Sequence, residues 1–208
     1  MASKFRIRYI FKPLVVLIAK GLIKIKVSPN LATSFMLCFS ILSFLTLSLF
    51  QNFLLFSIFV FITGIMDGCD GAIARLSSKS TKFGGFFDSF MDRFSEFFIF
   101  LGLFINRQNE FLWCFIDMKV IILISFISSI MISYTRARIE VFFKGDYDIG
   151  LMARSERLFY IVIISVVQIF YDFINIALLI FTCLVVATLS FRIYRFYKII
   201  KTNEKQIK

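Results

Sequence analysis

The sequence predicts an all-α integral membrane protein, with six transmembrane helices preceded by an N-terminal interfacial amphipathic helix. Hydrophobic residues make up 59% of the 208 residues and the mean hydropathy is +0.86, whereas soluble domains average about 45 to 50% apolar residues. A chain of this length cannot hide such an excess in one soluble core, so lipid must solvate part of it.

The N-terminal arm, residues 1–27, is the first expected unit. It carries seven Lys or Arg residues interleaved with aliphatic side chains, which is typical of an amphipathic helix lying at a membrane interface. The alternative is a signal peptide. That reading is disfavoured because the apolar run from Pro13 to Ala19 is short, ends at Lys20 and is followed by no small-residue cleavage site.

Residues 28–195 are expected to hold the six spanning helices, and residues 196–208 a basic cytoplasmic tail. An α-helix needs roughly 20 residues to cross a hydrocarbon core of about 30 Å. Six apolar stretches approach this length once their polar ends are included, and the last two are the least clearly separated. The expected spans are Leu31–Phe50, Phe53–Leu76, Gly84–Ile105, Lys119–Tyr134, Leu158–Tyr171 and Phe173–Phe191.

The distribution of basic residues predicts the orientation in a cell membrane. In the expected topology, 22 of the 24 Lys and Arg residues fall on one side, and only Arg107 and Lys119 on the other. By the positive-inside rule, both termini and the aspartate-bearing helix ends therefore face the cytoplasm. The net charge of +11 then reflects topology and contact with anionic membrane lipids, and we expect no nucleic acid partner.

Four aspartates lie within 26 residues of otherwise apolar sequence: Asp67, Asp70, Asp88 and Asp92. An ionised carboxylate in a membrane span costs a few kcal/mol, so such residues indicate function. The i, i+3 and i, i+4 spacings put each pair on one helix face. The pairs are also nearly equidistant from the turn at Ser77–Lys82, so an antiparallel hairpin would bring all four carboxylates into one pocket.

The residue types available restrict the chemistry of this pocket. The chain has no histidine, and its 4 cysteines are scattered without a CxxC pair. Ligands that are all oxygen favour Mg²⁺ or Mn²⁺, and four carboxylates suffice for two ions about 3.5 to 4 Å apart. Proton transfer must fall to a carboxylate, Lys, Tyr or water.

Gly71, Gly84 and Arg75 accompany the aspartates at fixed spacing. Glycine lets a ligand approach the backbone, and a fixed cation beside a metal cluster suits a pyrophosphate. Each feature also has an ordinary structural explanation. Arg75 alone fits an arginine that snorkels to the interface, and the glycines alone fit close helix packing.

Taken together, these positions read DGCDGAIAR, eight further residues, then GGFFDSFMD. At every fixed position the sequence resembles the signature of the CDP-alcohol phosphatidyltransferase family. The upstream SPNLAT, Ser28–Thr33, resembles the nucleotide-side motif of the same family. The resemblance implies transfer of a phosphatidyl-type group from a CDP-linked lipid to an alcohol with release of CMP, by an enzyme that forms a homodimer.

The resemblance also implies roles for individual residues. Asp67, Asp70 and Asp88 would ligate the metals, and Asp92 would combine ligation with removal of the proton from the attacking hydroxyl, which makes it the expected catalytic base. The residues expected to bind the CDP-lipid are Asn30, Leu31, Ala32, Thr33, Gly71, Arg75 and Thr81.

Arginines cluster at the cytoplasmic ends of the last three expected spans, in SYTRARIE, in ARSERL and at the end of the sixth span. They exceed what CDP requires, which favours an acceptor that already carries a phosphate. The alternative is that they only signal topology, with Glu140 and Glu156 neutralising two of them. The residues expected to bind the acceptor phosphate are Arg136, Arg138, Arg157 and Arg192.

This arginine pattern resembles the branch of the family that uses inositol 1-phosphate to make phosphatidylinositol phosphate or archaetidylinositol phosphate. Glycerol 3-phosphate, which gives phosphatidylglycerol phosphate, is the alternative acceptor. A divalent cation or proton-coupled transporter is the alternative from another class. A transporter predicts acids near the midplane and inverted repeats, and the second half of the sequence contains no copy of the aspartate pairs. Ester-linked and ether-linked lipid donors both remain open.

Overall fold

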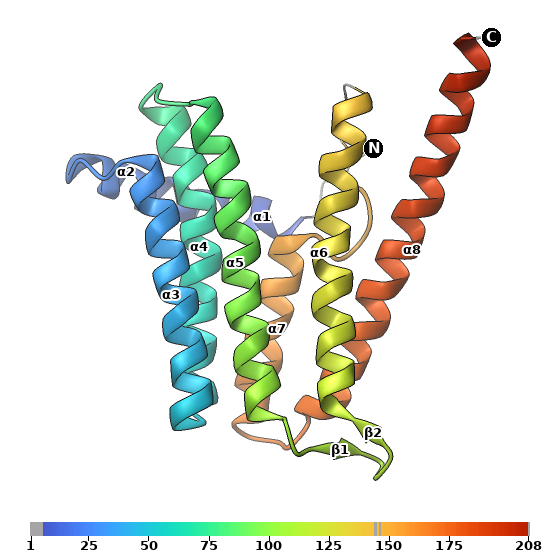
Figure 1. Ribbon diagram of the computed structural model, residues 1–208. Coiled ribbons are helices and arrows are strands. Elements are labelled where there is room, and N and C mark those ends of the chain that lie inside the picture. The colour runs from blue at the N-terminus through green and yellow to red at the C-terminus, as the bar shows by residue number, and fades with distance from the viewer. Residues whose placement is uncertain (1–5, 144, 146, 208) are drawn as a thin grey trace.

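The computed structural model describes residues 6–143, 145 and 147–207. Residues 1–5 and 208, which belong to the two expected end segments, lie outside the described residues. Six long helices form a bundle, and two short helices and a two-stranded β-ribbon complete the described part of the chain (Figure 1). In chain order the elements are α1 Ile7–Ile10, α2 Lys12–Lys24, α3 Pro29–Phe50, α4 Phe53–Leu76, α5 Lys82–Asn106, β1 Phe111–Leu112, β2 Ile116–Asp117, α6 Met118–Phe142, α7 Arg154–Gln168 and α8 Ile174–Ile207.

Local sequence chemistry explains where the first three long helices begin. Ser28, Asn52 and Thr81 each accept a hydrogen bond from the backbone N–H three residues later, at 2.9 to 3.2 Å. Such N-caps satisfy one of the unpaired amide groups at a helix start. Pro29 follows Ser28 at the first helical position, where its fixed φ is favourable. The loops between the apolar runs thus encode the helix boundaries.

Four of the long helices, α3, α4, α6 and α8, are long and apolar enough to cross a membrane. The other two expected spans do not meet this measure. α7 has only 15 residues, about 22 Å of helix, which is shorter than a hydrocarbon core of about 30 Å. α5 is long but carries Asp88, Asp92, Arg93 and Glu96 within its length. The expected number of six spans is therefore not confirmed.

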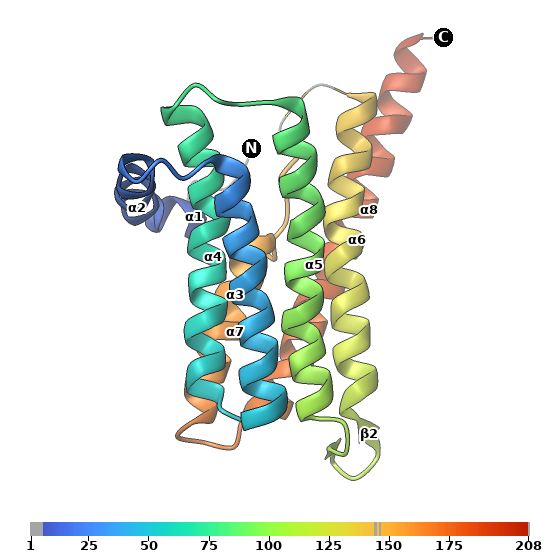
Figure 2. The same cartoon turned by 60° about the vertical axis from the view of Figure 1, so that its left-hand side comes forward.

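Helix α3 packs along both α4 and α5, and the latter two hardly contact each other (Figure 2). The aspartate helices are antiparallel as the sequence predicts. They are not a close-packed hairpin, because α3 holds them apart along one side. On the other side of α4 lies α7, while α6 packs against α5 and α8.

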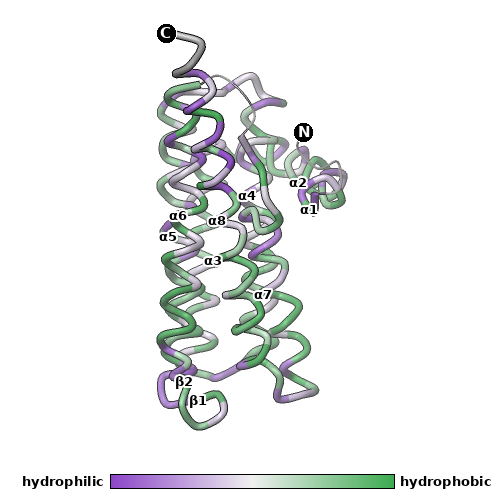
Figure 3. The backbone as a smooth tube through the Cα atoms, turned by 90° about the vertical axis from the view of Figure 1, so that its right-hand side faces the viewer, coloured by the Kyte–Doolittle hydropathy of each residue, from purple (hydrophilic) through white to green (hydrophobic). Residues whose placement is uncertain are grey.

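The N-terminal arm forms two helices, α1 and α2, that run across the bundle instead of along it (Figures 1 and 2). α2 rests on α4, where a Cβ placed on Gly68 would lie 3.1 Å from the methyl groups of Val15. At the other terminus α8 continues without a break to Ile207, so the expected tail is an extension of the last helix. Hydrophilic residues gather toward the half of the bundle that holds both termini (Figure 3).

Candidate functional site

The four aspartates line one cavity of about 500 Å³, called here the polar cavity. Carboxylate oxygens of Asp67, Asp88 and Asp92 all lie within 4.8 Å of one another. Asp70 lies deeper, where its Oδ2 accepts a hydrogen bond of 2.7 Å from the hydroxyl of Thr33 on α3. The predicted convergence is therefore observed, with three carboxylates clustered and the fourth anchored beside them.

The donor set of this cluster suits a hard divalent cation. Within the described part of the chain, Asp88 Oδ1 is buried and has no hydrogen-bond partner. A buried oxygen without a partner is costly unless something else satisfies it. Carboxylate oxygens are the ligands that Mg²⁺ and Mn²⁺ prefer, so a cation is the natural occupant.

Arg154, at the start of α7, already places a positive charge in the cluster. Its Nη1 donates hydrogen bonds to Oδ1 of both Asp67 and Asp92, and its Nη2 donates to Ser95 Oγ at 2.6 Å. Arg154 belongs to the arginine cluster that is recognisable in the sequence, where no separate role is expected for it. The available signal was its i, i+3 spacing to Arg157, which puts both side chains on one face of α7.

A second cavity of about 180 Å³, the small cavity, opens beside Asp70 and Asp88 between the ends of α3, α4 and α5. Five of the seven residues expected to bind the CDP-lipid line it: Asn30, Thr33, Gly71, Arg75 and Thr81.

The other two expected residues, Leu31 and Ala32, are not among those that line the small cavity. Leu31 is 43% exposed on the surface of α3. Ala32 is fully buried against Met36 and Met66. Successive residues of a helix point in different directions, so a contiguous motif on α3 cannot turn every side chain toward one cavity.

The signature glycines let neighbouring polar side chains lie against the backbone. A Cβ on Gly71 would stand 3.1 Å from Arg75 Nη1. One on Gly84 would stand 3.0 Å from Thr81 Oγ1 and 3.4 Å from Asn30 Oδ1. The glycines are expected to let a ligand approach the backbone closely. In this structure, side chains that line the small cavity occupy that space. Larger side chains at these glycines would push those groups out of place.

Two of the expected acceptor-binding arginines line the polar cavity but are engaged by the protein. Arg157 is fully buried and pairs with both carboxylate oxygens of Glu96, at 2.7 and 3.0 Å. Arg192 donates to the carbonyl oxygens of Ile149 and Ile132 and to Asp148 Oδ1, at 2.5, 3.0 and 3.1 Å. The Arg157 guanidinium thus links α7 to α5, and that of Arg192 links α8 to α6 and to the connection between α6 and α7.

The remaining two expected arginines differ from each other. Arg136 lines the polar cavity with 38% of its side chain exposed, and its Nε donates to Glu140 Oε1 at 2.8 Å. Arg138 lies outside that cavity, with its guanidinium 4.7 Å from the centre of the Phe142 ring. The pairing of Arg136 with Glu140, which belongs to the alternative that the arginines only signal topology, is therefore observed.

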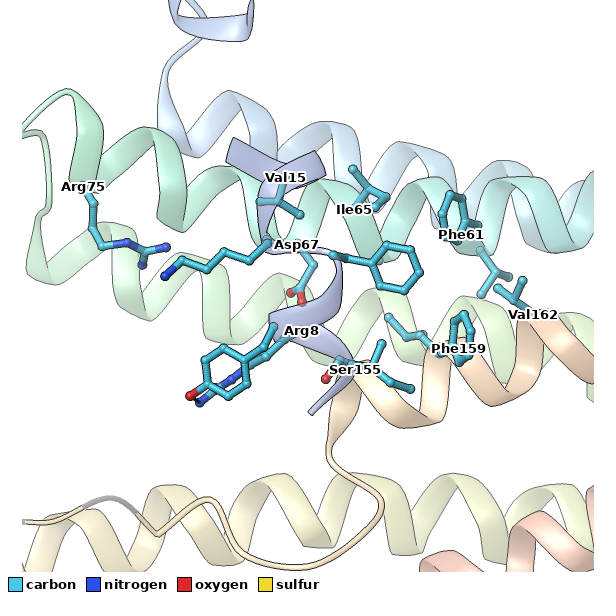
Figure 4. A pocket seen from close by; sticks show the side chains of 17 residues that line it. Arg8, Val15, Phe61, Ile65, Asp67, Arg75, Ser155, Phe159 and Val162 are labelled. Atoms are coloured by element: carbon cyan, nitrogen blue, oxygen red, sulfur yellow. Dashed lines mark hydrogen bonds between the residues drawn. The ribbon is translucent and has the colours of Figure 1, made fainter. Parts of the chain in front are cut away.

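A third cavity of about 410 Å³, the apolar cavity, lies between the N-terminal helices, α4 and α7 (Figure 4). Phe61, Phe159 and Val162 contribute its hydrophobic wall. Asp67 and Arg75 line both this cavity and the polar one, so the two adjoin at the acid cluster. This cavity is not foreseeable from the sequence, because its walls come from segments about 100 residues apart.

Comparison with known proteins shows to which family the chain belongs. The sequence profile of CDP-alcohol phosphatidyltransferases matches residues 26–194, which is most of the chain. The chain belongs to this family. As a CDP-alcohol phosphatidyltransferase it is a membrane enzyme of phospholipid synthesis, and the transporter alternative is not supported.

Relatives of this phosphatidyltransferase agree in sequence and in structure. The archaetidylinositol phosphate synthase of Pyrococcus horikoshii is 33% identical over 148 residues, which are 71% of this chain and 74% of the relative. The solved structure of Mycobacterium tuberculosis phosphatidylinositol phosphate synthase with CDP-DAG bound gives a TM-score of 0.76 at 25% identity, covering 89% of this chain and 94% of that one. Its complex with manganese and citrate gives a TM-score of 0.77 at 25% identity, covering 88% of each chain.

These findings fit the carboxylate cluster of the phosphatidyltransferase. One solved relative is described as a complex with manganese, which is one of the divalent cations that an all-oxygen donor set favours. Among the described residues, Asp67, Asp88 and Asp92 bring carboxylate oxygens close enough together to hold such an ion. The cofactor class expected from the sequence, Mg²⁺ or Mn²⁺, is confirmed.

Proposed function

We propose that this phosphatidyltransferase moves a diacylglycerol phosphate or archaeol phosphate group from a CDP-lipid to a phosphorylated polyol, 1L-myo-inositol 1-phosphate, and releases CMP. The observation that carries the proposal is the junction of three cavities at one acid cluster. Asp70 and Asp88 line both the polar and the small cavity, and Asp67 lines both the polar and the apolar cavity. The CDP-lipid donor also has three parts, a nucleotide, a pyrophosphate and apolar chains, and each can be matched to one of these regions.

The small cavity is assigned to the nucleotide, and the apolar cavity to the lipid chains. The pyrophosphate then lies between them, beside Asp67, Asp70 and Arg75. Two bound divalent ions held by Asp67, Asp70, Asp88 and Asp92 would neutralise the pyrophosphate and polarise its phosphorus–oxygen bonds. Arg75, exposed at this junction, is placed to add a charge-assisted hydrogen bond to the same group.

Asp92 is assigned as the base. The acceptor hydroxyl oxygen forms a bond to the lipid-side phosphorus, and the bond from that phosphorus to the bridging oxygen breaks. CMP leaves with the bridging oxygen and its electron pair, and the hydroxyl proton passes to the carboxylate of Asp92. Arg154 holds Oδ1 of Asp92 and Asp67 and so fixes the direction of these carboxylates.

The acceptor is assigned from the polar cavity and from the relatives. Arg136 presents a partly exposed guanidinium to this cavity, which suits a phosphate. The Pyrococcus and Mycobacterium relatives are synthases of inositol phosphate lipids, which favours inositol 1-phosphate over glycerol 3-phosphate. Arg192 would bind the acceptor only if its hydrogen bond to Asp148 were broken. Arg157 is paired with Glu96, and we assign it to holding that carboxylate in place.

The membrane arrangement completes the proposal. α5 and α7 lie alongside the four apolar helices, so we assign all six to the membrane, with α1 and α2 at its interface. Basic residues are concentrated at the end of the bundle that holds the termini, and by the positive-inside rule this supports assigning the active site and both termini to the cytoplasm. Assembly as a homodimer is part of the same proposal and rests on family resemblance.

Reconstituted enzyme with Mg²⁺ or Mn²⁺ provides the test. CDP-archaeol and CDP-diacylglycerol are each supplied with inositol 1-phosphate, glycerol 3-phosphate, free inositol or serine, and CMP is measured. We expect inositol 1-phosphate to support turnover, and Asp92→Asn to abolish it. Asp172→Asn, an exposed aspartate in the connection between α7 and α8, is the matched control and should retain activity. Turnover only with free inositol or serine would refute a phosphorylated acceptor.

A further inference from the structure

The N-terminal arm is tied to the connection between α6 and α7 by Arg6. This side chain is only 3% exposed. Its Nη2 donates to the carbonyl oxygens of Asp148 and Gly150 at 2.5 and 3.4 Å, and its Nη1 lies 3.1 Å from Asp148 Oδ2. A buried arginine held by two carbonyls and a carboxylate fixes the start of α1 in place.

The connection between α6 and α7, to which Arg6 binds, also contacts α8. Gly150 has φ +101°, and a Cβ there would lie 2.7 Å from Thr188 Cγ2, so the chain passes close to α8 at a position that favours glycine. Arg192 of α8 also binds the carbonyl of Ile149 and the carboxylate of Asp148. α1 is thus linked through this connection to α8, which is far away in the sequence.

Arg8 follows two residues after Arg6 and lines both the polar and the apolar cavity. Its side chain is 44% exposed, with Nη1 3.6 Å from Asp148 Oδ2 and Nη2 donating to the hydroxyl of Tyr9 at 3.3 Å. Asp67 and Ser155 line the same two cavities (Figure 4). A guanidinium therefore stands where the lipid end of the site meets the acid cluster.

We propose that Arg8 binds a phosphate of one of the substrates at this junction, and that Arg6 is the positioning residue that places it there. The inference rests on the proposed function. The side chains of Arg154, Arg157 and Arg192 are largely buried in their contacts with the fold. Arg8 also contacts the protein, at Asp148 and Tyr9, but its side chain is 44% exposed and lines both cavities. A planar guanidinium with several donors matches phosphate oxygens well.

Two substrate phosphates are chemically equivalent candidates: the lipid-side phosphate of the donor and the phosphate of the acceptor. Steady-state CMP release separates them. The concentration of CDP-lipid is varied at saturating acceptor, and acceptor is varied at saturating CDP-lipid. Arg8→Ala should raise KM for one of the two by about tenfold, the fold-change for losing a charge-assisted hydrogen bond. Arg8→Lys should recover part of the loss because it keeps the charge.

The matched control is Lys20→Ala, which removes an exposed charge from α2 outside both cavities. It should leave both KM values within twofold of those of the unmodified enzyme. Thermal unfolding of each variant shows whether it is folded. If Arg8→Ala does not fold, Arg8→Lys is measured in its place, and it should give a smaller rise in the same KM.

The outcomes are distinguishable. A rise in the donor KM assigns Arg8 to the lipid phosphate, and a rise in the acceptor KM assigns it to the acceptor phosphate. Unchanged KM values in an active, folded Arg8→Ala enzyme overturn the role of Arg8 and leave the proposed function standing. Absence of CMP release from the unmodified protein with every acceptor would overturn the proposed function, and with it the role of Arg8.

Discussion

The buried ion pair between Arg157 and Glu96 predicts that losing Arg157 damages stability, not acceptor binding. The side chains are 0% and 2% exposed, and two hydrogen bonds of 2.7 and 3.0 Å join the guanidinium to the two carboxylate oxygens. Arg157 Nη1 also donates to the carbonyl of Met152 at 3.0 Å. Arg157→Met keeps much of the side-chain volume but leaves the Glu96 carboxylate buried without its cation.

The magnitude follows from the burial of both partners. Breaking one side of a buried pair costs roughly 3 to 5 kcal/mol, because the remaining charge is uncompensated. In a protein of 150 to 250 residues each kcal/mol shifts the thermal midpoint by roughly 2 to 4 °C. We therefore expect Arg157→Met to lower Tm by about 6 to 20 °C. A double variant with Glu96→Leu should recover most of this loss, since no unpaired charge remains.

Circular dichroism of detergent-solubilised enzyme during heating measures Tm, and CMP release at varied acceptor concentration measures KM at a temperature where each variant is folded. The expected result is a low Tm with an acceptor KM close to that of the unmodified enzyme. A normal Tm combined with a strongly raised acceptor KM would refute the reasoning, because Arg157 would then contact the acceptor and contribute little to the fold.

Three further predictions concern single residues. Asp88→Asn should weaken Mn²⁺ binding by at least about tenfold in calorimetry, because it removes a buried carboxylate oxygen from the cluster; equal affinity would exclude Asp88 as a ligand. Arg136→Ala should raise the acceptor KM several-fold, whereas Arg138→Ala, which lies outside the polar cavity, should change it less than twofold, and equal effects would contradict the assignment. Gly150→Ala should lower stability in thermal unfolding by about 1 to 3 kcal/mol, because φ is +101° and Thr188 is close; an unchanged Tm would show that the connection adapts.

Helix positions and the acid cluster were largely predictable from local sequence. The apolar runs and their capping residues mark the long helices, and spacing along each helix puts Asp67 beside Asp70 and Asp88 beside Asp92. Two independent helices that meet at one turn then bring the pairs together, which the structure confirms. The preference for a hard cation follows from residue type alone, since oxygen is the only ligand atom present in the cluster.

The number of arginines near the site was predictable from the sequence, whereas their long-range partners within the fold were not. Whether an arginine binds substrate or the protein depends on which acids and carbonyls lie within about 3 Å, and these come from distant segments. Glu96 is 61 residues from Arg157, and Asp148 is 44 residues from Arg192. Sequence spacing gives neighbours only within a few residues of the same helix.

Hydropathy and helical periodicity are local properties, so the amino-acid sequence alone predicts a helical membrane protein with four convergent carboxylates. The shape of the site, by contrast, required the three-dimensional structure. It shows α3 holding the aspartate helices apart, Arg154 reaching into the carboxylate cluster, and the N-terminal arm placing Arg8 at the edge of the polar cavity. These features depend on packing between segments far apart in the chain, and no local pattern encodes them.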